Sequence, residues 1–191
     1  MGSSLLYMLH KPYGVLSQFT DEGRWQGLSC LALGLARDVY PIGRLDADSE
    51  GLLLLTNDNK LKTSLLDPKE GHTRTYHVQV EGTMSCQDLE MLERPMRLTI
   101  KGKSHVTRGC KAQAIHPNHP ARNPPIRYRA NIPDSWIELR LNEGKNRQVR
   151  RMTASLGYPT LRLIRVGMGP WTLGELQPGE CRQLNVHETN C

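Results

Sequence analysis

The chain has 191 residues and a formal net charge of +6, because 25 lysines and arginines stand against 19 acidic residues. The excess is local: residues 140–165 hold seven of the cations and one acid, so the rest of the chain is neutral. Five scattered cysteines without a Cys-x-x-Cys pair argue against a disulfide framework or a zinc knuckle, and no apolar run approaches the roughly 20 residues of a membrane span. We therefore expect a soluble, cytoplasmic protein that folds without disulfides or a structural metal.

The first half of the chain predicts strands. Residues 1–5 are expected to be a disordered lead-in or the remnant of a tag. The apolar run 52–55, followed by the polar residues 57–59, predicts a strand that is covered on both faces and ends in a turn. Apolar and polar residues alternate over 76–80, which is typical of a half-buried strand.

Two helices are predicted in the second half. Ser85, with Asp88 three residues later, resembles a capping box and opens a helix over 86–94. Asn146 is expected to cap a second helix that runs to Leu156, where Gly157 ends it.

The remaining segments complete the predicted fold. Five prolines in 116–133 indicate an extended surface loop, and the alternation over 137–141 indicates another strand. Strands and helices follow no clean βαβ rhythm, so we expect an α+β fold with a mixed, mainly antiparallel central sheet, flanking helices and loops, and two subdomains that share the sheet. One domain is expected over 6–185, with a tail at 186–191.

An acidic segment lies between two of these apolar stretches. Asp46, Asp48 and Glu50 occur at a spacing of two between the glycines at 43 and 51. The simplest interpretation is a charged turn between core strands. Three carboxylates could also bind Mg²⁺ in a nuclease, although the segment lacks the length and further oxygen ligands of an EF-hand loop.

A basic segment opens the second predicted helix. Lys145, Arg147, Arg150 and Arg151 fall within seven residues, where cations interact unfavourably with the helix dipole. Arginine side chains near the N–H groups of a helix start are suited to phosphate, whereas a solvated basic face is the simpler alternative. Tyr76, in the predicted strand, is either a core residue or one of the ten aromatic residues able to stack on a base.

Four sequence blocks occur in the same order as in a known protein family. Residues 9–15 (LHKPYGV), 43–58, 74–76 (RTY) and 143–152 (EGKNRQVRRM) resemble the successive blocks of one family of ribosomal RNA pseudouridine synthases, which comprises the small-subunit enzyme of type A and the large-subunit enzymes of types B, E and F. The resemblance implies that family's catalytic fold, without the small S4-type RNA-binding domain that many members carry before the first block. It also implies an isomerase that converts one uridine of 23S ribosomal RNA to pseudouridine, without cofactor or metal.

The resemblance assigns roles to individual residues. Asp46 would act at the sugar or the base, Arg150 would pair with it and orient it, and Tyr76 would stack on the flipped base and could assist proton removal from C5. The substrate would be free RNA or an assembly intermediate of the large ribosomal subunit, and the enzyme a monomer. The residues that would bind the substrate are Arg44, Leu163, Lys11, Lys145, Arg147, Arg151 and Arg165.

Two other functions remain open at this stage. The arginine face of the second helix alone would suit a non-catalytic RNA-binding factor, whose binding would survive loss of Asp46. A metal-dependent nuclease built on the acidic segment would instead lose RNA cleavage when EDTA is added.

Overall fold

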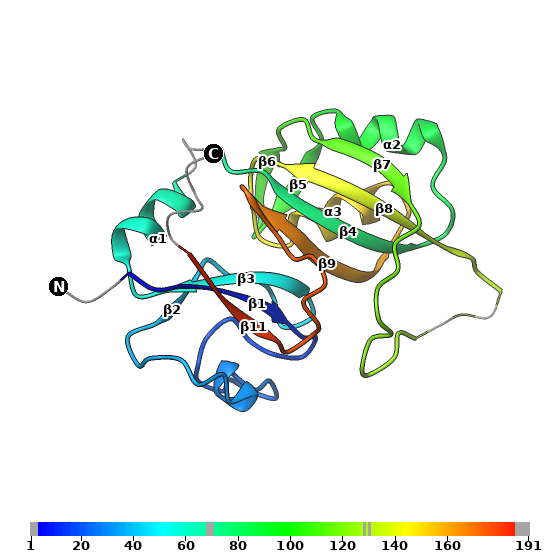
Figure 1. Ribbon diagram of the computed structural model, residues 1–191. Helices are drawn as coiled ribbons and strands as arrows, with labels where there is room; N and C mark the ends of the chain where they lie inside the picture. Colours follow the sequence, from blue (N-terminus) through cyan, green and yellow to red (C-terminus); the bar gives the residue numbers. More distant parts are fainter. Residues whose placement is uncertain (1–3, 68–70, 128, 130, 186–191) are drawn as a thin grey trace. The chain divides into compact units, whose positions relative to one another are not determined.

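A computed structural model describes residues 4–67, 71–127, 129 and 131–185 (Figure 1). The chain divides into two compact units, of which the first is formed by Met1–His72 with Arg165–Cys191 and the second by Thr73–Ile164. Both units combine strands with helices, which confirms the predicted α+β class. No helix in the described part of the chain is long and apolar enough to span a membrane.

The first unit is built on a sheet in which β11, β1 and β3 are neighbours in that order. Both pairs are antiparallel, and β2 pairs antiparallel with β3. Leu9, Leu53 and Leu55 belong to its core cluster. The elements of this unit are β1 (Leu6–Lys11), a 3-10 turn (Leu28–Leu31), β2 (Tyr40–Ile42), β3 (Glu50–Thr56), α1 (Asn59–Leu66), the C-terminal part of β9 (Thr160–Met168), β10 (Trp171–Thr172) and β11 (Cys181–Leu184).

The central strand of this unit is β3, and all seven of its residues are buried. The sequence predicted this burial from the apolar run 52–55. The turn that it predicted over 57–59 is instead the start of a helix, because the Asp58 carboxylate accepts hydrogen bonds from the N–H groups of Lys60 and Leu61. Sequence reasoning missed α1, although an aspartate followed by leucines four residues apart is a usable N-terminal signal.

The second unit has its own run of strands, in the order β9, β4, β8 and β7. The β4–β8 and β7–β8 pairs are antiparallel, and the hairpin of β5 and β6 forms a separate two-stranded sheet. The elements of this unit are β4 (Arg74–Glu81), α2 (Cys86–Glu93), β5 (Arg97–Ile100), β6 (Lys103–Val106), β7 (Lys111–Ile115), β8 (Asp134–Leu141), α3 (Gln148–Ser155) and the N-terminal part of β9.

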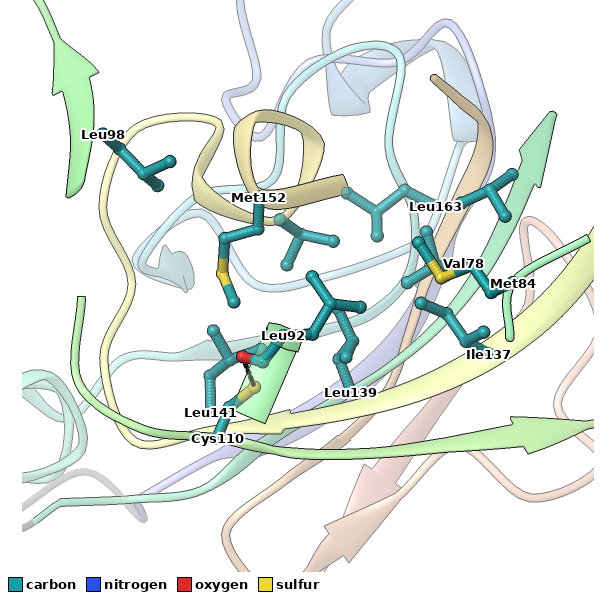
Figure 2. Packing of buried hydrophobic residues seen from close by; sticks show 12 residues of the cluster. Val78, Met84, Leu92, Leu98, Cys110, Ile137, Leu139, Leu141, Met152 and Leu163 are labelled. Atoms are coloured by element: carbon teal, nitrogen blue, oxygen red, sulfur yellow. Dashed lines mark hydrogen bonds between the residues drawn. The ribbon is translucent and has the colours of Figure 1, made fainter. Parts of the chain in front are cut away.

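The core of the second unit lies on one face of its sheet. Alternate residues of the two central strands, such as Val78 and Ile137, point into this core, as expected for half-buried strands. Leu92 of α2 and Met152 of α3 belong to the same cluster, and Figure 2 shows these side chains gathered together. Both helices therefore cover the same face of the sheet.

The two predicted helices are both present, but the start of α3 differs from the prediction. Ser85 caps α2 through the expected capping box with Asp88. The residue that caps α3 is Arg147, in the left-handed conformation with φ of 50°, and it makes no side-chain cap hydrogen bond. Asn146 was therefore wrongly predicted as the cap, since the chain turns one residue later.

The two ends of the chain were predicted to be a lead-in and a tail. Residues 1–3 of the expected lead-in and the expected tail at 186–191 lie outside the described residues. Ser4 and Leu5, which the sequence placed in the lead-in, have hydrogen-bond partners: Ser4 Oγ donates to Asp58 at 3.0 Å, and the Leu5 N–H donates to the side chain of Asn57 at 2.8 Å.

Candidate active site

The predicted catalytic carboxylate lies in the connection between β2 and β3 of the first unit. Asp46 is half-buried in this loop, and its carbonyl accepts a hydrogen bond from the Ser49 N–H at 3.0 Å. The sequence predicted a charged turn between two core strands, and the structure confirms that placement. The carboxylate is thus attached to a short turn between β2, of which Ile42 is buried, and the fully buried β3.

A segment about 30 residues earlier in the chain holds this loop in place. The Gly14 N–H donates to the carbonyl of Ala47 at 2.7 Å. The Ser17 hydroxyl donates to the carbonyl of Leu45 and accepts from the Leu45 N–H, both at 2.9 Å, and Ser17 is buried. These bonds connect the Asp46 loop to Ser17 and to Gly14, which lies in the 9–15 block. Sequence reasoning missed Ser17, because a single serine in a loop carries no pattern.

Lys11, which the sequence assigned to substrate binding, is fully buried. Its ammonium group donates to the carbonyls of Pro12 and Val15. Burial lowers the pKa of Lys11 from its usual 10.5 to about 7, against the opposing effect of Glu50 and of the aspartates at 46 and 48. The surroundings favour a role in fixing the acidic loop rather than direct contact with a ligand.

The lowered pKa of Lys11 makes a prediction about stability. Between pH 7 and about 9 the unfolded chain keeps the proton that the folded protein releases, so the free energy of unfolding should rise with pH by up to about 1.4 kcal/mol per unit. Below pH 7 the group is charged in both states and contributes no slope. Urea denaturation at several pH values should therefore show a rise in the wild type that Lys11→Met lacks.

The slope, and not the absolute stability, distinguishes the two proteins. Lys11→Met also loses the two hydrogen bonds to backbone carbonyls, which shifts its curve by a constant amount. Parallel curves for the two proteins from pH 7 to 9 would show that Lys11 keeps an ordinary pKa.

The other charged residues of the first unit differ in their exposure to solvent. Arg44 is exposed and donates to the side-chain oxygen of Gln18 at 3.3 Å, as suits a residue expected to reach RNA. Glu50, which the sequence placed in a charged turn, is instead buried at the start of β3, where it acts on Lys11. Arg165, predicted to contact substrate, is also buried, and its Nε donates to the carbonyl of Leu52 at 2.8 Å.

The second unit carries the other residues predicted for catalysis and for the pocket. Tyr76 lies half-buried on β4 and packs against the core cluster to which Leu163 belongs. Arg150 lies on α3, half-buried, with Nη1 3.4 Å from the carbonyl of Thr160. Tyr76 and Leu163 therefore share one side of the sheet in this unit, and Arg150 lies on a helix that covers that side.

The predicted phosphate-binding cations separate into exposed and tethered groups. Lys145 and Arg147 are exposed at the start of α3. Arg151 is half-buried and donates to the carbonyl of Thr99 at 2.8 Å. Arg162, another cation of the basic segment 140–165, is buried and donates to the carbonyl of Pro120 at 2.8 Å, so its charge is not displayed at the surface.

The proline-rich segment 116–133 contains no helix or strand among its described residues, as predicted. Its first part is attached to the β4–β8 sheet on the side opposite the core. His119 bonds His77 through ring nitrogens 2.8 Å apart, and its ring lies against that of Trp136 in a tilted arrangement, with the ring centroids 5.4 Å apart. Together with Arg162, these contacts fix the start of a loop that sequence reasoning left without an anchor.

A metal site was one of the alternatives for the acidic segment. The part of the chain that the structure describes contains no group of three or more His, Cys, Asp or Glu side chains arranged to hold a metal ion. Instead, Asp46 and Asp48 of the β2–β3 connection and Glu50 at the start of β3 all act on the buried ammonium of Lys11.

Comparison with known proteins supplies the family. Residues 5–155 match the family model of RNA pseudouridylate synthase, which covers more than half of the chain and includes both the Asp46 loop and the start of α3. The chain belongs to the RNA pseudouridylate synthase family.

Relatives within the RNA pseudouridylate synthase family are similar over nearly the full chain. The Ribosomal large subunit pseudouridine synthase E of Vibrio parahaemolyticus is 48% identical over 181 residues, covering 94% of this chain and 73% of that protein. Its namesake from Xanthomonas campestris is 47% identical over 180 residues, covering 93% of this chain and 94% of that protein. Type E is one of the members of the family that the sequence blocks resemble, and these matches confirm that resemblance.

The fold agrees with this family. A solved structure described as a pseudouridylate synthase superposes with a TM-score of 0.79 at 24% identity, covering 99% of this chain and 74% of that chain. At this identity the match concerns the fold alone, and it confirms the predicted pseudouridine synthase catalytic fold. The chain is therefore an RNA-modifying isomerase, and the alternative of a non-catalytic RNA-binding factor is not favoured.

Proposed function

We propose that this enzyme converts a specific uridine of the large-subunit (23S) ribosomal RNA to pseudouridine. The observation that carries the proposal is the 47–48% identity, over more than nine tenths of the chain, to proteins named Ribosomal large subunit pseudouridine synthase E. The enzyme would act as a monomer in the bacterial cytoplasm, on free RNA or on an assembly intermediate of the large ribosomal subunit. It would need no cofactor, as the resemblance to the family implies.

The reaction is an isomerisation in which every atom is retained. The bond between N1 of uracil and C1′ of ribose breaks, the base rotates, and a bond forms between C5 and C1′. The proton leaves C5, and N1 ends protonated. Catalysis then needs one carboxylate near the sugar, a group that removes the C5 proton, and a pocket that holds the base during rotation.

In this proposal Asp46 is the carboxylate, acting as a nucleophile or as a base at the sugar. Its fixed turn and the hydrogen bonds from residues 14 and 17 supply the positional accuracy that such a group needs. The exposed Arg44, two residues earlier, would enter the RNA and help to hold the uridine out of its stack.

The proposal assigns three further roles to residues of the second unit. Tyr76, whose ring is half-buried, would stack on the flipped base and assist removal of the C5 proton. Leu163, in the core beside it, would form part of the pocket wall. Arg150 would pair with the catalytic carboxylate, because an ionised carboxylate in a dry pocket requires a charged partner.

The role of Arg150 can be separated from that of the exposed cations. We expect Arg150→Ala to lower turnover at saturating RNA by about a hundredfold or more while changing the RNA dissociation constant by less than about threefold. Lys145→Ala, at the exposed start of the same segment, should do the reverse, weakening binding and flattening its salt dependence. Single-turnover kinetics with filter binding measures both, and similar binding defects in the two variants would contradict this division.

The proposed function itself is tested by mapping pseudouridines in large-subunit RNA from cells with and without the protein. We expect one site to disappear and to return when the gene is restored. An unchanged map, together with no isomerisation of unmodified large-subunit RNA by the purified protein, would contradict the proposal.

A further inference from the structure

Outside residues 140–165 the chain has no net charge, but it contains a second basic segment whose cations are balanced by acidic residues elsewhere. Residues 94–111 contain six lysines and arginines and no acidic residue, the same net charge as the segment 140–165. This segment comprises β5, β6 and the residues on either side of the hairpin, and it contributed to none of the predicted site residues. All six cations are exposed: Arg94, Arg97, Lys101, Lys103, Arg108 and Lys111.

Few acidic groups neutralise these cations. Lys111 lies 4.0 Å from Glu93, and Arg97 donates to the hydroxyl of Ser104 on the opposite strand at 3.3 Å. Among the described residues, none of the other four cations forms an ion pair with a carboxylate. Charges of one sign crowded on a small hairpin repel one another, so their placement is explained best by an anionic partner.

The tip of the hairpin supports this interpretation. Lys101 and Gly102 form the two-residue turn between β5 and β6, and both have positive φ, 49° and 76°. Asparagine, aspartate or glycine suits the first of these positions better than lysine. Charged residues, lysine above all, also protect exposed strand edges, but Lys101 lies in the turn and not in a strand. A lysine kept at an unfavourable backbone position therefore points to a use for its charge.

The hairpin is joined to the helix that carries the predicted phosphate-binding residues. Arg151 of α3 donates to the carbonyl of Thr99 in β5 at 2.8 Å, and Leu98 of β5 belongs to the same core cluster as Met152 of α3. Figure 1 shows β5 and β6 as a separate pair of short strands in the second unit. The exposed cations of the hairpin therefore extend the basic surface at the start of α3 within one unit.

We propose that the β5–β6 hairpin is a second RNA-binding surface, which contacts backbone phosphates of the substrate away from the uridine that reacts. The inference rests on the proposed function insofar as the RNA is the enzyme's substrate. Phosphate contacts of this kind hold the RNA in register without reading its sequence. The hairpin would therefore contribute affinity and salt dependence, and the Asp46 loop would contribute the chemistry.

The test compares two triple variants that each remove three positive charges. The hairpin variant is Arg97→Gln/Lys101→Asn/Lys103→Gln, and the control removes exposed cations of the first unit in Arg37→Gln/Lys60→Gln/Arg182→Gln. Binding of unmodified large-subunit ribosomal RNA, transcribed in vitro, is measured over a range of salt. We expect the hairpin variant to bind about tenfold more weakly at 0.1 M salt, with the slope of log K against log[salt] reduced by about two, and the control to stay within about twofold of the wild type.

The single variant Lys101→Asn keeps the test decisive if the triple variant folds poorly. It should unfold at the same or a higher temperature than the wild type, because asparagine suits the turn, and still bind the RNA about two- to fivefold more weakly. Equal weakening in both triple variants would mean that net charge alone matters, and binding by the hairpin variant that equals the wild type would overturn the inference.

Pseudouridine formation by the wild type in the same RNA separates this inference from the proposed function. If the wild type isomerises this RNA and the two triple variants bind it equally well, the inference about the hairpin is wrong and the proposed function still holds. The expected binding difference, with no isomerisation of this RNA and an unchanged pseudouridine map in cells, would contradict the proposed function and leave an RNA-binding hairpin. A wild type that neither binds nor modifies this RNA, together with an unchanged map, would overturn both.

Discussion

Replacing Asp46 by Asn should abolish pseudouridine formation while the protein stays folded and still binds RNA. The side chain is half-buried in a turn that is held through backbone groups and through Ser17, so the amide fits where the carboxylate was. We expect at least about a thousandfold loss of turnover, as for removal of an essential catalytic group. Release of tritium from C5-labelled uridine in the RNA measures the reaction, and the thermal unfolding midpoint reports the fold.

Asp48→Asn is the matched control for this variant. Both aspartates lie in the same connection, and both act electrostatically on the buried ammonium of Lys11. If Asp46 served only to balance that charge, the two variants should lose activity to a similar extent. We expect Asp48→Asn to keep activity within about tenfold of the wild type. Normal activity in Asp46→Asn would end the assignment of Asp46 as the catalytic residue.

Gly51→Ala should destabilise the first unit strongly, because position 51 combines backbone strain with a steric overlap. Gly51 has φ of +104°, and a Cβ atom at this position would lie 2.2 Å from the backbone carbonyl oxygen of Arg165 and 2.7 Å from its nitrogen. Backbone strain of about 1 to 3 kcal/mol and overpacking of about 1 to 3 kcal/mol add to a loss of roughly 4 kcal/mol in the free energy of unfolding. Urea denaturation followed by tryptophan fluorescence measures the loss.

Gly34→Ala separates strain from overlap. Gly34 also has positive φ, +65°, but no atom lies within 4 Å of the place where its Cβ would be. It should therefore cost about 1 to 2 kcal/mol, from the backbone alone. If the two alanine variants unfold at the same urea concentration, the close approach of residues 51 and 165 is not what limits stability.

The parts of the fold that could be predicted were those with a local pattern. The run 52–55 and the alternation at 76–80 each reflect how a strand is buried, and both strands were found. The Ser85–Asp88 capping box is formed within four residues, so its helix was also found. By contrast, β1, β5, β6, β7, β9, β10 and β11 received no prediction, because strand formation depends on pairing and packing with neighbouring segments and not only on the local residue pattern.

In the candidate site, too, local sequence patterns could be interpreted and contacts between distant segments could not. Residue identity and spacing pointed to Asp46 and to the basic start of α3. They could not show that the positive charges of Lys11, Arg162 and Arg165 are buried, because burial depends on segments up to about a hundred residues away, such as the Leu52 carbonyl that accepts from Arg165. The summed charge was likewise neutral outside 140–165, and a basic hairpin was overlooked because acidic residues elsewhere cancelled it.

The pairing of β1 with β11 has a consequence for the order in which the enzyme matures during synthesis. The second unit is one continuous stretch, Thr73–Ile164, and its chain is complete before Arg165–Cys191 is translated. The first unit must wait, since β1 binds β11 through registers such as Leu9 with Cys181, and the His10 carbonyl accepts from the Gly179 N–H at 2.8 Å. Lys11 is the last residue of β1, so the strand that carries it gains its β11 partner only from residues translated after the whole of the second unit. The surroundings of the acidic residues that act on Lys11 are therefore completed later than the synthesis of Thr73–Ile164.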